Sequence, residues 1–527
     1  MAFYLGLDSS TQSLTAVVID TVRGVVSHSS AVNFGEELPQ YGCPQGFLPD
    51  SDPLVRHADP RIWAAALECV LVKLRREGLD LSGIAGISGS GQQHGTVYLR
   101  RPFPGTLARG ETLADLVGRS LTRPTSPIWM DSSTGAECRE IDAALGGAAE
   151  VRRRSGSSAV ERFAGPQIRR FAKTEPERYT RTELIHLVSS FMCSLLLGKS
   201  APIDVSDGAG MNLLNLAAAT WDPDLLRATA RGLGARLPAT APSGSRCGMV
   251  APYLVERYGF HPAAQVVAWS GDNPNSLIGV GGWRPGTAVI SLGTSDTYFA
   301  AMSTPAVDPQ GCGHVFGNPA GGFMCLICFK NGSLAREQVK QAHGLSWPQF
   351  DLESFATTPA GNGGNLMLPY FVPEITPVVL RPGVVRRGEP AFVGGQQAAA
   401  SVRAIVEAQA LSMKLHSGWI GEAPAALRVT GGASRSDGIC QVIADVFNAS
   451  VERLEVAHSA ALGAAMRAAQ AIEALSWDEL TARFCRCDVA RAVTPVPSNV
   501  AVYRALLPAF AAFEAEHLGS GPHEVAP

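Results

Sequence analysis

Two segments of this 527-residue chain share one pattern, in which a short apolar strand runs into a turn of small polar residues and returns as a second apolar strand. The first spans Phe3–Ile19, with its turn around Ser9–Ser13, and the second spans Gly286–Met302, with its turn at Gly293–Thr297. Apolar runs on both sides of small polar residues are typical of β-hairpins. Two matching hairpins so far apart indicate a duplicated domain and disfavour a solenoid or propeller of short repeats.

Helical and strand patterns alternate along the rest of the chain, which predicts the α/β class. We expect residues 101–126 to form a surface loop and Gly519–Pro527 a frayed end. The predicted helices are Asp59–Glu77, Ser132–Leu145, Pro176–Leu197, Pro223–Gly234, Gly394–Ile420, Asp437–Phe447 and His458–Ala474, and the predicted strands are Ile84–Ser88, Val266–Trp269 and Ala426–Thr430.

Composition limits the class of protein. With 46% hydrophobic and 17% charged residues, the chain has the balance of an ordinary soluble globule. A net charge of -3 gives no footprint for a polyanion, so we expect no nucleic acid partner. The apolar stretch Leu184–Leu197 is too short and too polar to span a membrane, and the N-terminus lacks a basic leader, which together predict a cytoplasmic protein. Eleven cysteines at irregular spacings favour reduced thiols over a disulfide framework.

The turns of the two hairpins are candidate phosphate loops. Backbone N–H groups of a tight turn can surround a phosphate, and hydroxyls add further donors. Asp8, at the strand end beside the first turn, is placed to hold Mg²⁺, which prefers one or two carboxylates together with phosphate oxygens. Either turn alone is more often only a turn. The candidate loop residues are Thr11, Gln12 and Ser13 in the first turn and Gly293, Thr294 and Ser295 in the second.

The third candidate segment is a glycine-rich passage, Gly431-Gly432-Ala433-Ser434, which leads from a predicted strand into a predicted helix. Small residues at a helix N-terminus make a flat surface suited to a nucleotide, although a plain strand-to-helix turn has the same pattern. Two other nucleotide motifs are missing from the sequence. Gly89-Ser90-Gly91 lacks the full order of a dinucleotide fingerprint, and no P-loop motif occurs.

Asp272 follows an apolar strand and is the candidate general base, because a carboxylate near a hydroxyl can orient it and accept its proton. An Asp before Asn-Pro is also a common turn residue. Gln93 and His94 follow another strand and offer groups that can bind sugar hydroxyls, and Arg162 can hold substrate oxygens. A structural His and a solvated surface Arg would show the same local pattern.

Taken in order, these motifs resemble the FGGY carbohydrate kinases, from about Phe3 to about Phe513. Within that family they look most like the D-xylulose kinases, especially at Arg162–Ile168, Ser206–Leu214, Gly313–Phe316 and Phe329–Ser333. The motifs that carry the resemblance are Asp8–Ser13, Gln92–Gly95, Trp129–Asp131, Pro202–Asp204, Gly271–Pro274, Ser291–Ser295 and Gly431–Ser434.

The resemblance implies two actin-like, ribonuclease-H-like domains with a cleft for ATP and sugar between them. It implies an N-terminal domain at 1–284 that binds sugar and carries the base, and a C-terminal domain at 285–517 that binds nucleotide. We expect the last helix to pack back on the first domain and 518–527 to be a flexible tail.

By the same resemblance the enzyme phosphorylates the terminal hydroxyl of D-xylulose, using ATP and Mg²⁺, as a monomer or homodimer. Asp272 is then the base, with Gln93, His94, Arg162 and Asn273 as sugar contacts and Asp8 near the metal. The nucleotide contacts implied are Thr11, Gln12, Ser13, Gly293, Thr294, Ser295, Gly431, Gly432, Ala433 and Ser436.

Two positions depart from the family pattern. Thr15 stands where the first phosphate motif often has Lys or Arg, and Ser436 stands where the adenosine motif often has Asn. Both departures favour an alternative interpretation, a sugar-binding regulator that keeps the fold but has lost turnover. The motifs also fit a kinase for ribulose, glycerol or another ketose or polyol, and an actin-like ATPase that needs no sugar.

Overall fold

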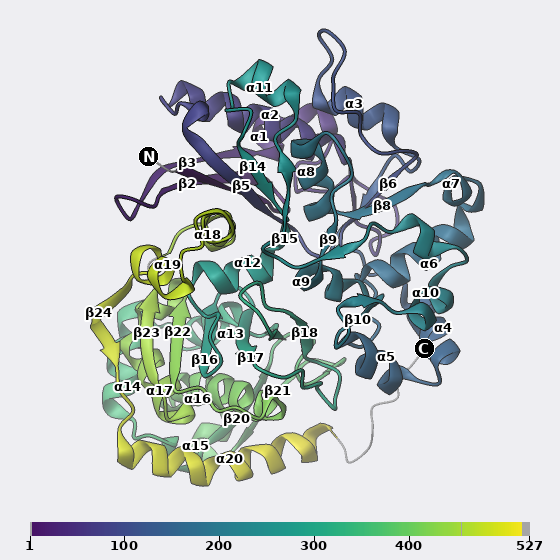
Figure 1. Ribbon diagram of the computed structural model, residues 1–527. Coiled ribbons are helices and arrows are strands. Elements are labelled where there is room, and N and C mark those ends of the chain that lie inside the picture. The colour runs from purple at the N-terminus through teal and green to yellow at the C-terminus, as the bar shows by residue number, and fades with distance from the viewer. Residues whose placement is uncertain (1–2, 455, 519–527) are drawn as a thin grey trace. The chain divides into compact units, whose positions relative to one another are not determined.

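The computed structural model describes residues 3–454 and 456–518 (Figure 1). The chain divides into two compact units by its internal contacts. Unit 1 contains Met1–Trp283, Ser303–Met324 and Val456–Arg486, and unit 2 contains Arg284–Met302, Cys325–Glu455 and Cys487–Pro527. Two segments from the second half of the sequence therefore belong to unit 1. Within the described residues, every helix is too short or too polar to cross a membrane.

The sheet of unit 1 is built around the first predicted hairpin. Strand β1 (Phe3–Ser9) pairs antiparallel with β2 (Ser13–Asp20) and parallel with β5 (Ile84–Gly91), so the hairpin is confirmed. The strand order of this sheet is β13 (Arg246–Met249), β14 (Gln265–Val267), β5 (Ile84–Gly91), β1 (Phe3–Ser9), β2 (Ser13–Asp20) and β3 (Val25–Asn33).

Alternating side chains of β1 and β2 cover the two faces of this sheet. Leu5 and Leu7 pack into a core with helices α2 (Arg61–Arg76) and α8 (Val188–Leu197), whereas Tyr4 packs on the opposite face with α18 (Ser459–Glu473). Because side chains of a strand alternate between faces, these apolar residues need helices on both sides. Figure 1 shows α18 beside the strands of this sheet. Helix α12 (Asp272–Gly279) belongs to the same unit.

Helices α12 and α18 approach each other closely through glycine. A Cβ atom on Gly279 would lie 1.9 Å from the carbonyl oxygen of Ser459, and one on Gly463 would lie 1.9 Å from that of Asn275. Only glycine leaves room for this contact. The close packing ties the segment Val456–Arg486 to the helix that begins with Asp272.

Unit 2 repeats the topology of unit 1. Strand β16 (Thr287–Leu292) pairs antiparallel with β17 (Asp296–Met302) and parallel with β22 (Ala426–Thr430), so the second hairpin and the duplication are also confirmed. The strand order is β19 (Phe323–Phe329), β17 (Asp296–Met302), β16 (Thr287–Leu292), β22 (Ala426–Thr430), β23 (Ser450–Leu454) and β24 (Cys487–Val493).

The helical part of unit 2 is centred on α16 (Ala398–His416), which is buried on nearly all sides because α13 (Ser333–Ala342), α17 (Asp437–Phe447) and α20 (Pro497–Leu518) pack round it. The last helix, α20, thus contacts α16 and α17 within unit 2. The expected packing of the last helix on the first domain stays a prediction. The segment that joins unit 1 is the one containing α18. The predicted limits 1–284 and 285–517 stay predictions, and residues 519–527 lie outside the described residues.

Two predicted segments fold differently from expectation. Pro176–Leu197 is not one helix, because β8 (Leu184–Leu187) interrupts it to pair with β6 (Thr96–Leu99). Residues 101–126 are not all loop, because α3 (Leu113–Ser120) forms there. This helix starts with a capping box, in which Thr112 and Asp115 bind each other's backbone N–H groups.

Candidate active site

Polar residues meet at one end of the unit 1 sheet. Strand β15 (Ser270–Gly271) pairs in parallel with β5, where Ser270 lies beside Ser90, and β1 pairs with the other edge of β5, where Asp8 lies beside Ser90. Parallel strands end at the same edge of a sheet. The residues that follow them, Gln93 and Asp272, are therefore brought close to Asp8.

The Asp272 carboxylate is held by amide groups at the start of α12. The backbone N–H of Asn273 donates to Asp272 Oδ1 at 2.8 Å, and Asn273 Nδ2 donates to the same oxygen at 3.1 Å. Asn273 Nδ2 also donates to Gln93 Oε1 at 2.8 Å. Burial raises the pKa of Asp272 to about 6, since a charged carboxylate loses solvation there. A fixed carboxylate of this pKa can accept a proton from a hydroxyl near neutral pH.

A buried carboxyl group that sequence analysis did not single out, Asp207, supports this arrangement. Ser189 Oγ donates to Asp207 Oδ2 at 2.5 Å, and Gln93 Nε2 donates to Asp207 Oδ1 at 3.5 Å. Burial, together with the nearby carboxylates of Asp204 and Asp272, raises its pKa to about 8. A Cβ atom on Gly271 would lie 2.7 Å from Asp207 Oδ1, so glycine is needed there. Asp207 lies in the stretch 206–214 that carried the resemblance, but its neighbours became visible only in the fold.

Asp8 is the least satisfied of these carboxyl groups. Its Oδ1 is buried and has no hydrogen-bond partner among the described residues. Burial and the charge of Asp272 raise the pKa of Asp8 to about 7. The residue directly opposite Asp8 on β2 is Thr15, which carries no charge. Within the described part of the chain, no group of three or more His, Cys, Asp or Glu side chains could hold a metal by itself.

His94 is fixed beside these groups in a neutral form. Its backbone φ is 72°, a conformation that non-glycine residues adopt mainly where the surrounding structure enforces it. His94 Nδ1 lies 2.9 Å from the carbonyl oxygen of Gly210, and its ring stacks on Phe163 at 4.2 Å. Burial, with the charge of Arg162, lowers the pKa of His94 to about 3. The carbonyl can only accept, so Nδ1 carries the proton and Nε2 is an acceptor.

Arg162 reaches the same cluster. Its guanidinium lies over the Phe163 ring, with 5.5 Å from Cζ to the ring centroid, and its Nη2 lies 2.9 Å from His314 Nε2. His314 was not among the predicted site residues, because it enters unit 1 with the later segment Ser303–Met324. The predicted sugar-site residues Gln93, His94, Arg162, Asp272 and Asn273 are thus grouped in one unit, and their roles stay predictions.

The first candidate phosphate turn is closed by its own serines and held by a tryptophan. The backbone N–H of Ser10 donates to the carbonyl of Ser13 at 3.0 Å, while Gln12 is exposed. Trp129 Nε1 donates to Thr11 Oγ1 at 2.8 Å. This leaves the Thr11 hydroxyl hydrogen free to rotate toward a ligand.

The second candidate turn and the glycine-rich passage lie side by side within unit 2. Strand β16 ends next to β22, with Ser291 beside Thr430, so Gly293 and Gly431 follow neighbouring strand ends. Both segments are open to solvent, with Thr294, Ser295, Gly431 and Gly432 exposed and Gly293 and Ala433 partly exposed. The turn at 293–295 and the passage at 431–433 can therefore act on one ligand.

Ser436 differs from these neighbours because it is buried. Its hydroxyl accepts a hydrogen bond from the backbone N–H of Ile439 at 3.2 Å and so caps α17. Serine is among the preferred residues at this position. The departure from Asn is therefore compatible with a well-formed helix start, and the contact of Ser436 with nucleotide stays a prediction.

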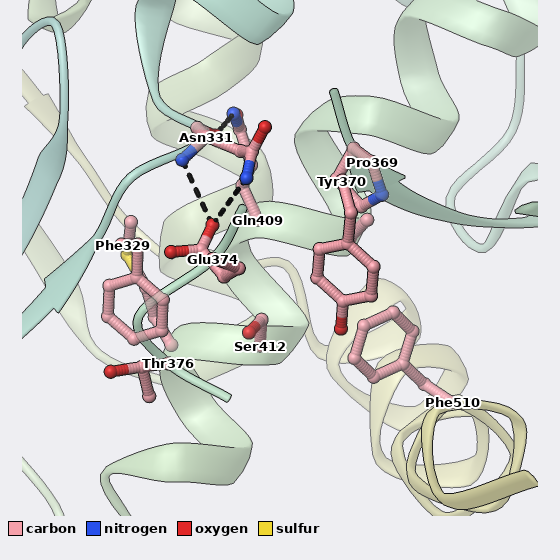
Figure 2. A pocket seen from close by; sticks show the side chains of 11 residues that line it. Phe329, Asn331, Pro369, Tyr370, Glu374, Thr376, Gln409, Ser412 and Phe510 are labelled. Atoms are coloured by element: carbon pink, nitrogen blue, oxygen red, sulfur yellow. Dashed lines mark hydrogen bonds between the residues drawn. The ribbon is translucent and has the colours of Figure 1, made fainter. Parts of the chain in front are cut away.

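A small cavity lies inside unit 2 but does not coincide with the predicted loops. Its volume is about 20 Å³, enough for about one water molecule and far too little for a sugar or nucleotide. Figure 2 shows its lining, in which Glu374 accepts hydrogen bonds from the backbone N–H and the Nδ2 of Asn331 at 2.9 and 2.8 Å. We interpret it as a packing defect beside a satisfied polar cluster.

Comparison with known proteins gives a consistent result. Residues 110–279 match the profile of the N-terminal domain of the FGGY family of carbohydrate kinases, and residues 288–472 match that of its C-terminal domain. The chain is 38% identical to a xylulose kinase of Rattus norvegicus, over 99% of this chain and 98% of the relative. It is 40% identical to xylulose kinase 2 of Arabidopsis thaliana, over 89% of this chain and 87% of the relative.

A solved structure shares the fold over its whole length. The crystal structure of a xylulose kinase from Rhodospirillum rubrum matches with a TM-score of 0.82 at 22% identity, covering 98% of each chain. The two-unit α/β architecture therefore occurs in a solved structure.

Proposed function

The chain belongs to the FGGY family of carbohydrate kinases, and we propose that it transfers a phosphoryl group from ATP to the terminal hydroxyl of D-xylulose, giving D-xylulose 5-phosphate. One observation carries the proposal within the site. Asp272, with a pKa of about 6, is fixed by Asn273 and Gln93 at the converging strand ends of unit 1.

In the proposed reaction Asp272 acts as general base. The terminal hydroxyl oxygen of the sugar attacks the γ-phosphorus of ATP, its proton passes to the Asp272 carboxylate, and the bond from the γ-phosphorus to the bridging oxygen breaks to leave ADP. Asn273 holds Asp272 Oδ1 at 3.1 Å, which orients the carboxylate before the proton moves. Positioning of this kind is a major source of rate enhancement in phosphoryl transfer.

The neighbouring groups are proposed to hold the sugar. His94, neutral because its pKa is about 3, presents Nε2 as an acceptor for a hydroxyl, and Arg162 presents N–H donors to sugar oxygens. Asp207, whose pKa of about 8 keeps it mostly protonated at neutral pH, holds Gln93 without adding a second full negative charge. Of these two carboxyl groups, Asp272 ionises at the lower pH and is therefore the one that can act as the base.

The nucleotide is proposed to bind through the two turns and the glycine-rich passage. The fit to Mg²⁺ rests on Asp8, since its buried Oδ1 lacks a partner among the described residues and a cation would offset the charges of Asp8 and Asp272. When bound, Mg²⁺ neutralises phosphate charge that develops on the leaving group. The residues assigned to the phosphates and nucleoside are Thr11, Gln12, Ser13, Gly293, Thr294, Ser295, Gly431, Gly432, Ala433 and Ser436.

The first test measures ADP release with D-xylulose, other ketopentoses, L-ribulose, glycerol and no sugar. We expect release to depend on sugar and to be fastest with D-xylulose. Faster ADP release with another sugar or polyol than with D-xylulose would identify that compound as the preferred substrate. Equal release without sugar would indicate an ATPase, and no release with any sugar would favour a binding protein.

The second test replaces the base. Asp272→Asn should lower kcat by about 10² to 10⁴, the range for a general base, while sugar binding persists. Asp142→Asn is a matched control, because burial also raises the pKa of Asp142 to about 6, but its carboxylate lies on α4 (Gly135–Leu145), outside the site. The control should keep the parent kcat. Parent turnover in Asp272→Asn would show that Asp272 is not the base.

A further inference from the structure

His314 lies at the start of β18 (His314–Gly317), in the segment that rejoins unit 1, and hydrogen bonds hold the backbone on both sides of it. The Asp308 carboxylate accepts hydrogen bonds from the backbone N–H groups of Cys312 at 2.8 Å and Gly313 at 2.7 Å, which fixes the turn just before it. On the other side, the backbone N–H of Val315 donates to the carbonyl of Gly156 at 3.2 Å. His314 is only 4% exposed.

The contact with Arg162 determines the form of this imidazole. Nη2 of Arg162 lies 2.9 Å from His314 Nε2, and a guanidinium group can only donate. Nε2 must therefore carry a lone pair, and the proton of a neutral ring is on Nδ1. Burial and the charge of Arg162 also lower the pKa of His314 well below its ordinary value. The ring stays neutral at physiological pH.

Aromatic rings restrict the remaining freedom of the pair. Phe163 lies 5.1 Å from the His314 ring by centroids, and the Arg162 guanidinium lies over Phe163 at 5.5 Å. Phe163 also stacks on His94 at 4.2 Å. One phenyl ring thus contacts both histidines and the arginine, which couples the direction of Arg162 to the position of His94.

We infer that His314 is a positioning residue for Arg162. It accepts one guanidinium N–H and so aims the guanidinium, while its neutral ring leaves the positive charge of Arg162 available for substrate oxygens. A carboxylate at this position would align the guanidinium equally well but would offset its charge. The inference rests on the proposed role of Arg162 as a sugar contact.

Three substitutions separate alignment from charge. His314→Gln keeps a neutral acceptor near the Nε2 position, His314→Glu keeps an acceptor but adds a negative charge, and His314→Phe removes the acceptor while keeping a ring. Loss of a hydrogen bond to a charged group typically changes binding by about tenfold or more. We expect His314→Phe and His314→Glu to raise KM for D-xylulose about tenfold or more and His314→Gln to stay within about threefold of the parent.

The KM for ATP should not change in any variant, which distinguishes positioning from general damage. His261→Phe, at an exposed histidine of unit 1, is the control and should behave like the parent. If His314→Phe does not fold, as judged by its Tm, His314→Asn replaces it, because that shorter amide does not reach the Nε2 position. In an Arg162→Met background, His314→Phe should change KM for D-xylulose by less than about twofold, because positioning acts through Arg162.

The outcomes also separate this inference from the proposed function. A parent protein without xylulose-dependent ADP release would contradict the proposed function itself. With an active parent, an unchanged KM for D-xylulose in folded His314→Phe would overturn the inference alone. Equal damage in His314→Gln and His314→Phe would overturn it as well, since rescue by a neutral acceptor is its distinctive result.

Discussion

The turn of the unit 1 hairpin follows Asp8, and the turn of the unit 2 hairpin precedes Asp296, so each hairpin carries one carboxyl group beside its turn. In both units the first strand of the hairpin pairs antiparallel with the second and parallel with a later strand. The two carboxyl groups nevertheless have different surroundings.

Asp296 is paired. Arg336 donates to it through two hydrogen bonds, Nη1 to Oδ2 at 2.8 Å and Nη2 to Oδ1 at 3.1 Å, and both side chains are buried. Gln409 accepts a further bond from Arg336 Nη1 at 2.7 Å. Gly332 lies so close that a Cβ atom would be 2.7 Å from the carbonyl of Thr294. Both oxygens of this carboxylate are therefore engaged by Arg336, and the pair stabilises the turn.

Asp8 has no such cationic partner among the described residues. Its Oδ1 is buried without a hydrogen bond from that part of the chain, and burial and the like charge of Asp272 raise its pKa more than a hydrogen bond with Ser90 lowers it. The strand position opposite is Thr15. One copy of the hairpin uses its carboxylate to support the fold, whereas the other has a buried carboxylate oxygen without a partner among the described residues, which supports the proposed cation site.

The largest effect on stability is expected from removing the partner of Asp296. Arg336→Met would leave Asp296 buried without its cation and should lower the free energy of unfolding by about 3 to 5 kcal/mol. Chemical denaturation measures this change. Arg387→Met is the control, because Arg387 pairs with Glu516 at the exposed surface of unit 2, and its loss should cost about 0 to 1 kcal/mol. Equal costs for the two variants would contradict a special role for the buried pair.

The unpaired copy should respond in the opposite way. Asp8→Asn should lower kcat about a hundredfold or more, because a carboxylate proposed to hold Mg²⁺ is lost. Stability should not fall, since burial and the like charge of Asp272 disfavour the charged carboxylate more than the hydrogen bond from Ser90 favours it. A fall in stability as large as that of Arg336→Met would show that Asp8 has a structural partner.

The pH dependence of stability sharpens the same test. The folded-state pKa of Asp8, about 7, lies above its ordinary value of 3.8, so the folded state binds this proton more tightly. The resulting stability is complete below about pH 3.8 and is lost as the pH rises through about 7. Asp272 and Asp207 contribute in the same direction. In Asp8→Asn the decline of unfolding free energy between about pH 4 and pH 8 should therefore be shallower than in the parent.

Sequence alone predicted the features that are local. The hairpins, the strand before Gly431 and most helices follow from apolar periods and small polar turns. The capping box of Thr112 and Asp115 was also a local signal, but its helix was missed in a stretch interpreted as loop. The strand within Pro176–Leu197 was missed for another reason, because its residues suit a helix and the distant partner β6 decides the outcome.

The missed site residues have no local signal of their own. Asp207 becomes a candidate only through its hydrogen bonds with Gln93 and Ser189. His314 becomes one only through its contact with Arg162. The fold brings these partners close, although they are separated in the sequence. Only the family resemblance marked the stretches that contain them. In contrast, Asp272 and Asn273 are adjacent in the chain, and their hydrogen bonds could be anticipated from that adjacency.

The smallest expected effect concerns how each turn is held. In unit 2 the backbone N–H of Ser333 donates to the carbonyl of Gly293 at 2.9 Å, whereas in unit 1 a side chain, Trp129, donates to Thr11 at 2.8 Å. Trp129→Phe removes that single neutral hydrogen bond, which is typically worth about 0.5 to 1.5 kcal/mol, and should raise KM for ATP about two- to tenfold.

Trp347→Phe provides the control, because Trp347 is 47% exposed and Trp129 is 44% exposed, and the Trp347 ring packs against Phe350 and Lys340 in unit 2. It should leave both KM values unchanged. The kcat and the KM for D-xylulose should also stay at parent values in Trp129→Phe, since Thr11 is assigned to phosphate. If KM for D-xylulose rose while KM for ATP stayed constant, the first turn would belong to the sugar, and the functional correspondence between the two hairpins would fail.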